Sequence, residues 1–171
     1  DEISTLQDPD FVAPGGVSRW GDKNKCELEV CSFRSYGKGG ASNELRSLEY
    51  AQFSFLIRSN KTKKYRCRYS VAISNLNGEA LTSLKSNEDV FYGRKGTFRQ
   101  INVGLNPLQL GSGIYYLSIG IHRYSALEKI NSEKRYDLLS RSFEINIKNP
   151  DSWASFDRRY FHSCEWRYDE V

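Results

Sequence analysis

The chain has 171 residues, a formal net charge of +4 and an isoelectric point near 8.8. This length suits a single domain that can bury its core without disulfides or a structural metal. The positive charge is weaker than expected for a dedicated nucleic-acid binder, and no apolar run approaches the roughly 20 residues that a membrane-spanning helix needs.

The first 17 residues contain Pro, Gly, Asp and Ser without a hydrophobic period, which predicts a linker. Residues 18–171 are predicted to form one domain. The acidic start lacks the basic and apolar regions of a signal peptide. Because the first residue is not Met, we expect the chain to be a fragment of a longer protein.

Beyond the linker, six stretches alternate between apolar and polar residues, which is the period of a half-buried strand. Clusters of Gly, Asn, Ser and Pro separate them. Strands at this spacing, each with one apolar face, predict an all-β fold, an antiparallel β-sandwich. The stretch 126–139 has some helical character, and we expect it to be a long loop or a short helical turn. The six predicted strands lie in residues 25–33, 50–60, 65–74, 98–105, 114–122 and 142–148.

The run Leu110-x-x-Gly113-x-Tyr115 precedes one of these strands. It is typical of the tyrosine corner of immunoglobulin-like sandwiches, in which a tyrosine hydroxyl bonds to nearby backbone. We therefore interpret Tyr115 as an architectural residue and expect Leu110 to pack beneath it. The corner favours an immunoglobulin-like sandwich.

No motif for catalysis, a metal or a cofactor stands out. Gly16 and Gly21 have the first spacing of a phosphate loop, but no lysine follows at the required position. Cys26 and Cys31 differ by an odd number within one predicted strand, so they should point to opposite faces. We expect free thiols and, from them, a reducing compartment. The four cysteines are Cys26, Cys31, Cys67 and Cys164.

Polar, cationic and aromatic residues on the outward side of the strands provide the candidate ligand site. Gly120 leaves a place without a side chain, and we predict a shallow depression there. Rings beside arginines and amides suit either saccharides or stacked bases, although solvated strand faces explain each residue equally well. Arg99 is included although alternation turns it toward the core. The predicted site residues are Arg66, Arg68, Tyr92, Arg99, Gln100, Asn102, Tyr116, His122 and Tyr124.

The order of the motifs resembles a known family. The segments "RWGDKNKCELEVCSF", "YAQFSFLIRSN" and "YSVAISNLNGE" are followed by "DVFYGRKGTFRQINVGLNPLQLGSGIYYLSIGIH", "YDLLSRSFEINI" and "FDRRYFHSCEW". This order is similar to the C-terminal carbohydrate-binding domain of Wzt-type ATPase subunits, which belong to ABC transporters that export O-antigen polysaccharide. The resemblance runs from about residue 17 to the end.

The resemblance implies a non-catalytic module that follows a nucleotide-binding domain and recognises the non-reducing end of an O-antigen chain, often through a capping modification. It implies a cytoplasmic location at the inner-membrane face and a transmembrane transporter subunit as partner. It also implies a homodimer, in which the last strand can be exchanged between protomers. In "YFHSCEWRY" that strand would present Tyr160, His162 and Trp166. The family provides no universal set of ligand residues to carry over.

Two other classes of function stay open. An immunoglobulin-like protein-interaction or adhesion domain would be marked by disulfides and an extracellular location. A single-strand nucleic-acid binder would show a steep salt dependence, and we expect no nucleic-acid partner. We expect no enzyme activity from this fragment, because no catalytic arrangement is recognisable in its sequence.

Overall fold

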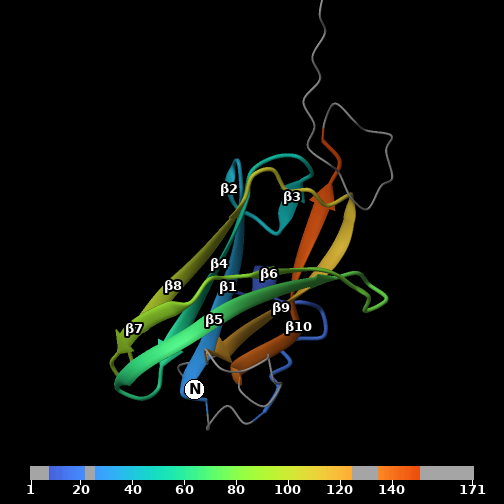
Figure 1. Ribbon diagram of the computed structural model, residues 1–171. Coiled ribbons are helices and arrows are strands. Elements are labelled where there is room, and N and C mark those ends of the chain that lie inside the picture. The colour runs from blue at the N-terminus through green and yellow to red at the C-terminus, as the bar shows by residue number, and fades with distance from the viewer. Residues whose placement is uncertain (1–7, 22–25, 125–134, 151–171) are drawn as a thin grey trace, which may run out of the picture.

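The computed structural model describes residues 8–21, 26–124 and 135–150. These residues form two β-sheets, preceded by the short 3-10 helix η1 (Pro9–Phe11). Figure 1 shows the sheets as two layers, with β1, β4 and β8 in one and β5, β9 and β10 in the other. The predicted all-β sandwich is confirmed.

The four-stranded sheet has the order β2–β1–β4–β8. The six-stranded sheet has the order β3–β10–β9–β5–β6, and β7 pairs with the other end of β5. Every pair is antiparallel except β3 with β10, which is parallel. The four-stranded sheet comprises β1 (Leu28–Gly37), β2 (Gly40–Ala41), β4 (Ala51–Ser59) and β8 (Phe98–Leu105). The six-stranded sheet comprises β3 (Glu44–Arg46), β5 (Lys63–Ser74), β6 (Ala80–Lys85), β7 (Asp89–Gly93), β9 (Gly113–Arg123) and β10 (Arg135–Lys148).

The core lies between the two sheets and consists of the inward residues of both. Phe33 of β1 sits near its centre. Its ring centroid lies 5.8 Å from that of Phe53 in the same sheet and 5.0 Å from that of Phe143 in the opposite sheet. All three rings are buried. The side chains of these strands therefore alternate between core and outer face as the sequence predicts, and the outward side chains are able to make other contacts.

All six predicted strands are present, but the prediction for 126–139 was wrong where the structure describes it. Arg135–Leu139 begins β10, and residues 125–134 lie outside the described part. The register of β10 against β9 shifts between Arg135 and Asp137 and again between Leu139 and Phe143. The first shift inserts one residue and moves the inward set to the other parity, whereas the second inserts two residues and interrupts the alternation without changing its parity. Short β6 and β7 were also missed, because their residues are mostly half-buried or exposed.

The N-terminal segment, residues 8–20, packs on the sandwich although much of it reads as a linker. Phe11 is buried and its ring lies 6.3 Å from that of Phe33. The amide of Ser140 donates to the carbonyl of Ser18, and the amide of Trp20 donates to the carbonyl of Leu138, both at 2.8 Å. The N-terminal segment therefore runs alongside β10, and it does so both before and after the domain boundary that we predicted after residue 17.

A buried ion cluster joins this segment to both sheets. Asp137 of β10 accepts hydrogen bonds from Arg19 Nε at 3.0 Å, from the amide of Val30 at 2.8 Å and from the amide of Leu138 at 2.9 Å. Arg19 in turn donates to the carbonyl of Val30 at 2.8 Å. Because Val30 belongs to β1 in the other sheet, one carboxylate ties together three parts of the chain.

The tyrosine corner is present. The buried Tyr115 hydroxyl donates to the carbonyl of Gly111 at 2.8 Å, and Leu110 is buried in the core. This confirms the architectural role that we predicted for Tyr115.

Cys31 and Cys67 are free thiols, as predicted. Cys31 and Cys67 are buried, and burial raises the pKa of each to about 11. Cys26 precedes β1 instead of lying in it, so the alternation argument for its orientation does not apply. Across residues 8–21, 26–124 and 135–150, no helix has the length and apolar character needed to cross a bilayer.

Candidate functional site

The outer face of the six-stranded sheet brings together six of the nine predicted site residues. Arg68 of β5 lies opposite His122 of β9 in the ladder, and Tyr116 lies opposite Ser74. Tyr92 of β7 is 66% exposed and lies opposite Lys64. The six residues are Arg66, Arg68, Tyr92, Tyr116, His122 and Tyr124.

Tyr124 organises the two arginines of β5. The guanidinium carbons of Arg66 and Arg68 lie 4.8 Å and 4.6 Å from the centroid of its ring, within the range of cation–π contacts. Arg66 also forms an ion pair with Glu88, which holds the pKa of that carboxyl below its ordinary value. In the described part of the chain, Arg68 has no such carboxylate partner within ion-pair distance. Its guanidinium is therefore positioned by Tyr124 and is available to a ligand.

The depression predicted at Gly120 is filled by neighbouring side chains. A Cβ at this position would lie 2.8 Å from Ser70 Oγ and 2.9 Å from His122 Nε2. Ser70 Oγ and His122 Nε2 are themselves hydrogen-bonded at 2.7 Å. The missing side chain therefore makes room for the half-buried imidazole and its partner, and Gly120 does not form an open hollow.

Tyr116 lies at the far end of this face. It is six residues from His122 along β9, which is about 20 Å of strand. The guanidinium carbon of Arg141 lies 5.0 Å from its ring centroid. Arg141 is held in turn by the carbonyls of Asn75 and Leu76, each at 3.3 Å. Tyr116 and His122 therefore do not line one small depression.

Gln100 and Asn102 belong to the other sheet, so the single groove that we predicted does not form. Both lie on the outer face of β8. Asn102 Oδ1 accepts from Ser54 Oγ at 2.7 Å, and Gln100 Nε2 donates to the same Ser54 oxygen at 2.8 Å. Tyr50 lies near this polar patch and is 44% exposed. The patch is a separate and uncharged candidate surface.

Arg99 bridges the two sheets at their edge. It is exposed and binds the Asp89 carboxylate through two hydrogen bonds of 2.9 Å and 2.8 Å. Its guanidinium carbon also lies 4.5 Å from the ring centroid of Phe91. The inward orientation that alternation suggested is wrong, because Arg99 turns at the sheet edge to reach β7. Its charge is already compensated by Asp89.

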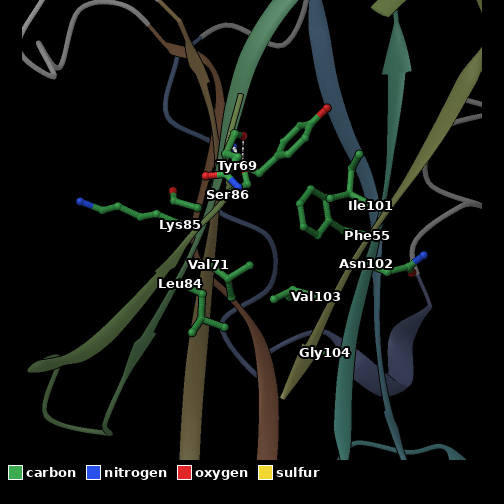
Figure 2. Close-up of a pocket in the computed structure, with 12 residues that line it drawn as sticks. Phe55, Tyr69, Val71, Leu84, Lys85, Ser86, Ile101, Asn102, Val103 and Gly104 are labelled. Atoms are coloured by element: carbon green, nitrogen blue, oxygen red, sulfur yellow. Dashed lines mark hydrogen bonds between the residues drawn. The ribbon is translucent and has the colours of Figure 1, made fainter. Parts of the chain in front are cut away.

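A cleft of about 370 Å³ opens between β8 and β6, where the two sheets separate. Figure 2 shows Phe55, Ile101 and Val103 facing Val71 and Leu84 across it. Lys85 also borders the cleft but extends away from it (Figure 2). The cleft is therefore mainly apolar, and Asn102 is the predicted site residue that it includes.

Three basic residues of the cationic face were missed. Arg135 lies opposite His122 on β10, and Lys85 lies opposite Ser70 on β6. Arg141 sits in the second irregular part of β10 with a positive φ of 47°. The sequence did not indicate the positions of Arg135 and Arg141, because the register shifts interrupt the alternation in β10. Lys85 was missed because its strand, β6, was not predicted.

Protonation of His122 makes folding stability depend on pH. Burial first, and then the charges of Arg135 and Lys85, lower the pKa of His122 below 6.5. Between the lowered value and about 6.5, the unfolded chain binds more protons than the folded chain. We expect stability to fall as pH decreases through this window, and the variant His122→Asn to lose that part of the slope. Urea unfolding above and below about pH 6.5 measures it, and an unchanged slope in the variant would contradict the assignment.

The predicted dimer residues Tyr160, His162 and Trp166 lie outside the described residues. Within the described part, no group of three or more His, Cys, Asp or Glu side chains is arranged to hold a metal ion.

Comparison with known proteins shows the fold. No protein-family model matches the chain, and no curated protein shows significant similarity to it. Among solved structures, the C-terminal domain of Wzt aligns with a TM-score of 0.69 at 17% identity, covering 94% of this chain and 93% of that one. A CARDB domain from Pyrococcus furiosus aligns at 12% identity with a TM-score of 0.42, covering 81% and 94% of the two chains. A β-glucosidase from Listeria innocua aligns at 10% identity with a TM-score of 0.40, covering 77% of this chain and 16% of that one. This chain has the sandwich fold of the Wzt C-terminal domain.

Proposed function

We propose that this chain is a non-catalytic carbohydrate-binding module that recognises the non-reducing terminus of an O-antigen polysaccharide for export by an ABC transporter. The likeness in fold to the Wzt C-terminal domain over 94% of the chain supports this role. The order of sequence motifs supports it independently of the structure. The proposal includes a cytoplasmic location at the inner-membrane face and a transmembrane transporter subunit as partner.

One observation supports a site on the outer face of the six-stranded sheet. Tyr124 holds the guanidinium of Arg68 in position, and Arg68 has no carboxylate within ion-pair distance in the described part. A fixed guanidinium gives directional hydrogen bonds to sugar hydroxyls or to an acidic cap. Tyr92 supplies an exposed ring on the same face, against which the CH groups of a sugar can pack.

We expect a single site on this open face to bind weakly, because contacts with a shallow surface contribute little free energy beyond the entropic cost of ordering the ligand. Two copies in a dimer would compensate through avidity. A homodimer formed through the segment with Tyr160, His162 and Trp166 is therefore part of the proposal.

Tyr124→Ala is expected to weaken binding to the cognate glycan by about fivefold or more, since loss of an anchoring residue costs more than about 1 kcal/mol. The matched control is Tyr50→Ala, which removes an exposed tyrosine from the other sheet. A glycan array with capped and uncapped O-antigen termini identifies the ligand, and isothermal titration then measures both variants. Loss of binding in Tyr50→Ala alone would move the site to the polar patch around Gln100 and Asn102.

The alternative is an immunoglobulin-like protein-interaction or adhesion domain. The buried Cys31 and Cys67 are free thiols and provide no disulfide of the kind that would mark such a domain. Titration of reactive thiols in the unfolded full chain separates the two functions, because a disulfide would lower the count below four.

A further inference from the structure

Basic side chains form a row across the outer face of the six-stranded sheet. Arg68 of β5 and Arg135 of β10 each lie directly opposite His122 of β9. Lys85 of β6 joins the row beside Ser70, the hydrogen-bond partner of His122. Residues directly opposite in a sheet have Cβ atoms about 5 Å apart. The imidazole of His122 therefore has a cation on each side, and its protonation would place like charges directly opposite one another.

The carboxylates of the described residues do not neutralise the row. Glu88 forms an ion pair with Arg66, and the only residue of the row with which it interacts electrostatically is Arg68, at one end. Asp137 is buried on the inner side and pairs with Arg19. Glu144 lies opposite Tyr116, about 20 Å along β9 from His122. In the part of the chain that the structure describes, neither Lys85 nor Arg135 forms an ion pair.

Arg135 also carries a buried donor without an acceptor. Its Nε atom is shielded from solvent and has no hydrogen-bond partner. Buried polar groups are nearly always hydrogen-bonded, because an unmade bond there costs free energy. An oxyanion placed against the guanidinium of Arg135 would neutralise its charge and accept hydrogen bonds from it.

His122 lies between these cations and is poised to respond to an anion. Its Nε2 is bonded to Ser70 at 2.7 Å, and Gly120 leaves the space in which the ring sits. Burial, together with the charges of Arg135 and Lys85, lowers the pKa of His122, so the free protein holds a neutral imidazole at neutral pH. A bound anion would offset those two charges and favour the imidazolium.

We propose that Lys85, His122 and Arg135, with Arg68 at the border, bind an anionic substituent of the ligand, a phosphate ester or a carboxylate, and that His122 takes up a proton from solvent on binding. The choice of face rests on the proposed function. The chemistry of the subsite can be tested without any glycan.

The test is a proton NMR titration of His122 in the full chain, with sulfate as the probe. Sulfate stays fully ionised across the pH range, and the variant His162→Asn leaves His122 as the one remaining histidine. We expect the pKa of His122 to be higher in sulfate than in chloride of equal ionic strength. A rise of about one unit corresponds to about tenfold tighter binding to the imidazolium form. An equal pKa in the two salts would overturn the proposal.

Charge variants separate a specific subsite from general screening. Lys85→Gln and Arg135→Gln should each abolish the effect of sulfate. Lys64→Gln removes one positive charge from an exposed position of the same face, outside the row, and should keep the effect. Equal loss in Lys64→Gln would overturn the proposal, and the exposed position of Lys85 keeps the test valid if Arg135→Gln fails to fold.

Binding of simple sugars then identifies the anion. Glucose 6-phosphate, glucuronate and glucose carry a phosphate, a carboxylate and no charge respectively. Binding of either anionic sugar with proton uptake supports the subsite, and equal binding of all three contradicts it. If sulfate raises the pKa of His122 but no glycan binds, the proposed function fails and the anion subsite stands.

Discussion

Replacement of Asp137 by alanine is expected to lower the free energy of unfolding by about 3–5 kcal/mol, because it removes one partner from a buried ion pair. The carboxylate is buried and compensates Arg19 at 3.0 Å. Its loss leaves Arg19 with the longer ion pair to Glu29 at 3.9 Å, and leaves the amides of Val30 and Leu138 without their acceptor. Two sheets and the N-terminal segment lose a common attachment in this variant.

Urea unfolding of the variant and its controls measures this effect. Glu144→Ala is the matched control on the same strand, since Glu144 is partly exposed on the outer face, and we expect a change within about 0.5 kcal/mol. Asp137→Asn keeps one acceptor oxygen, which can serve one of the two amides, and loses the charge, so its cost should be intermediate. A loss below about 1 kcal/mol in Asp137→Ala would contradict the central role of this carboxylate.

Phe33→Ala is expected to cost about 3–5 kcal/mol by leaving a cavity between the sheets. The ring is buried and contacts Phe11, Phe53 and Phe143, which come from the N-terminal segment and both sheets. Thermal unfolding should therefore show a large decrease in midpoint temperature. The control Phe98→Ala removes a ring that is 48% exposed and should have a much smaller effect. Similar losses in both variants would contradict the placement of the core.

The sequence was sufficient for the fold where side chains alternate without interruption. Phe53 and Phe55 of β4 and Leu117 and Ile119 of β9 lie in the core as predicted. Alternation failed in the first part of β10, because one register shift changes the parity of its inward residues and a second inserts two extra residues between Leu139 and Phe143. It also failed in β6 and β7, whose half-exposed residues bury too little apolar surface to leave a clear pattern.

For the candidate site, the sequence predicted on which face of its strand a residue lies, but not which strands are adjacent. Period two placed Arg68 and His122 on the outer side, yet it could not say that their strands are adjacent or that β8 belongs to the other sheet. Strand order depends on long-range pairing that no local pattern encodes. Arg135 joins His122 only through that pairing, and the space at Gly120 is taken by a side chain from its own strand and one from β5.

The N-terminal segment has a mechanical consequence. Ala13, Ser18 and Trp20 exchange backbone hydrogen bonds with Ser142, Ser140 and Leu138 of β10, the strand that also carries Arg135. A pull on the first residues of the chain, while a ligand is held on the sheet, loads these bonds together along the strand. The segment is therefore expected to transmit tension to β10, the strand that carries Arg135 of the proposed subsite.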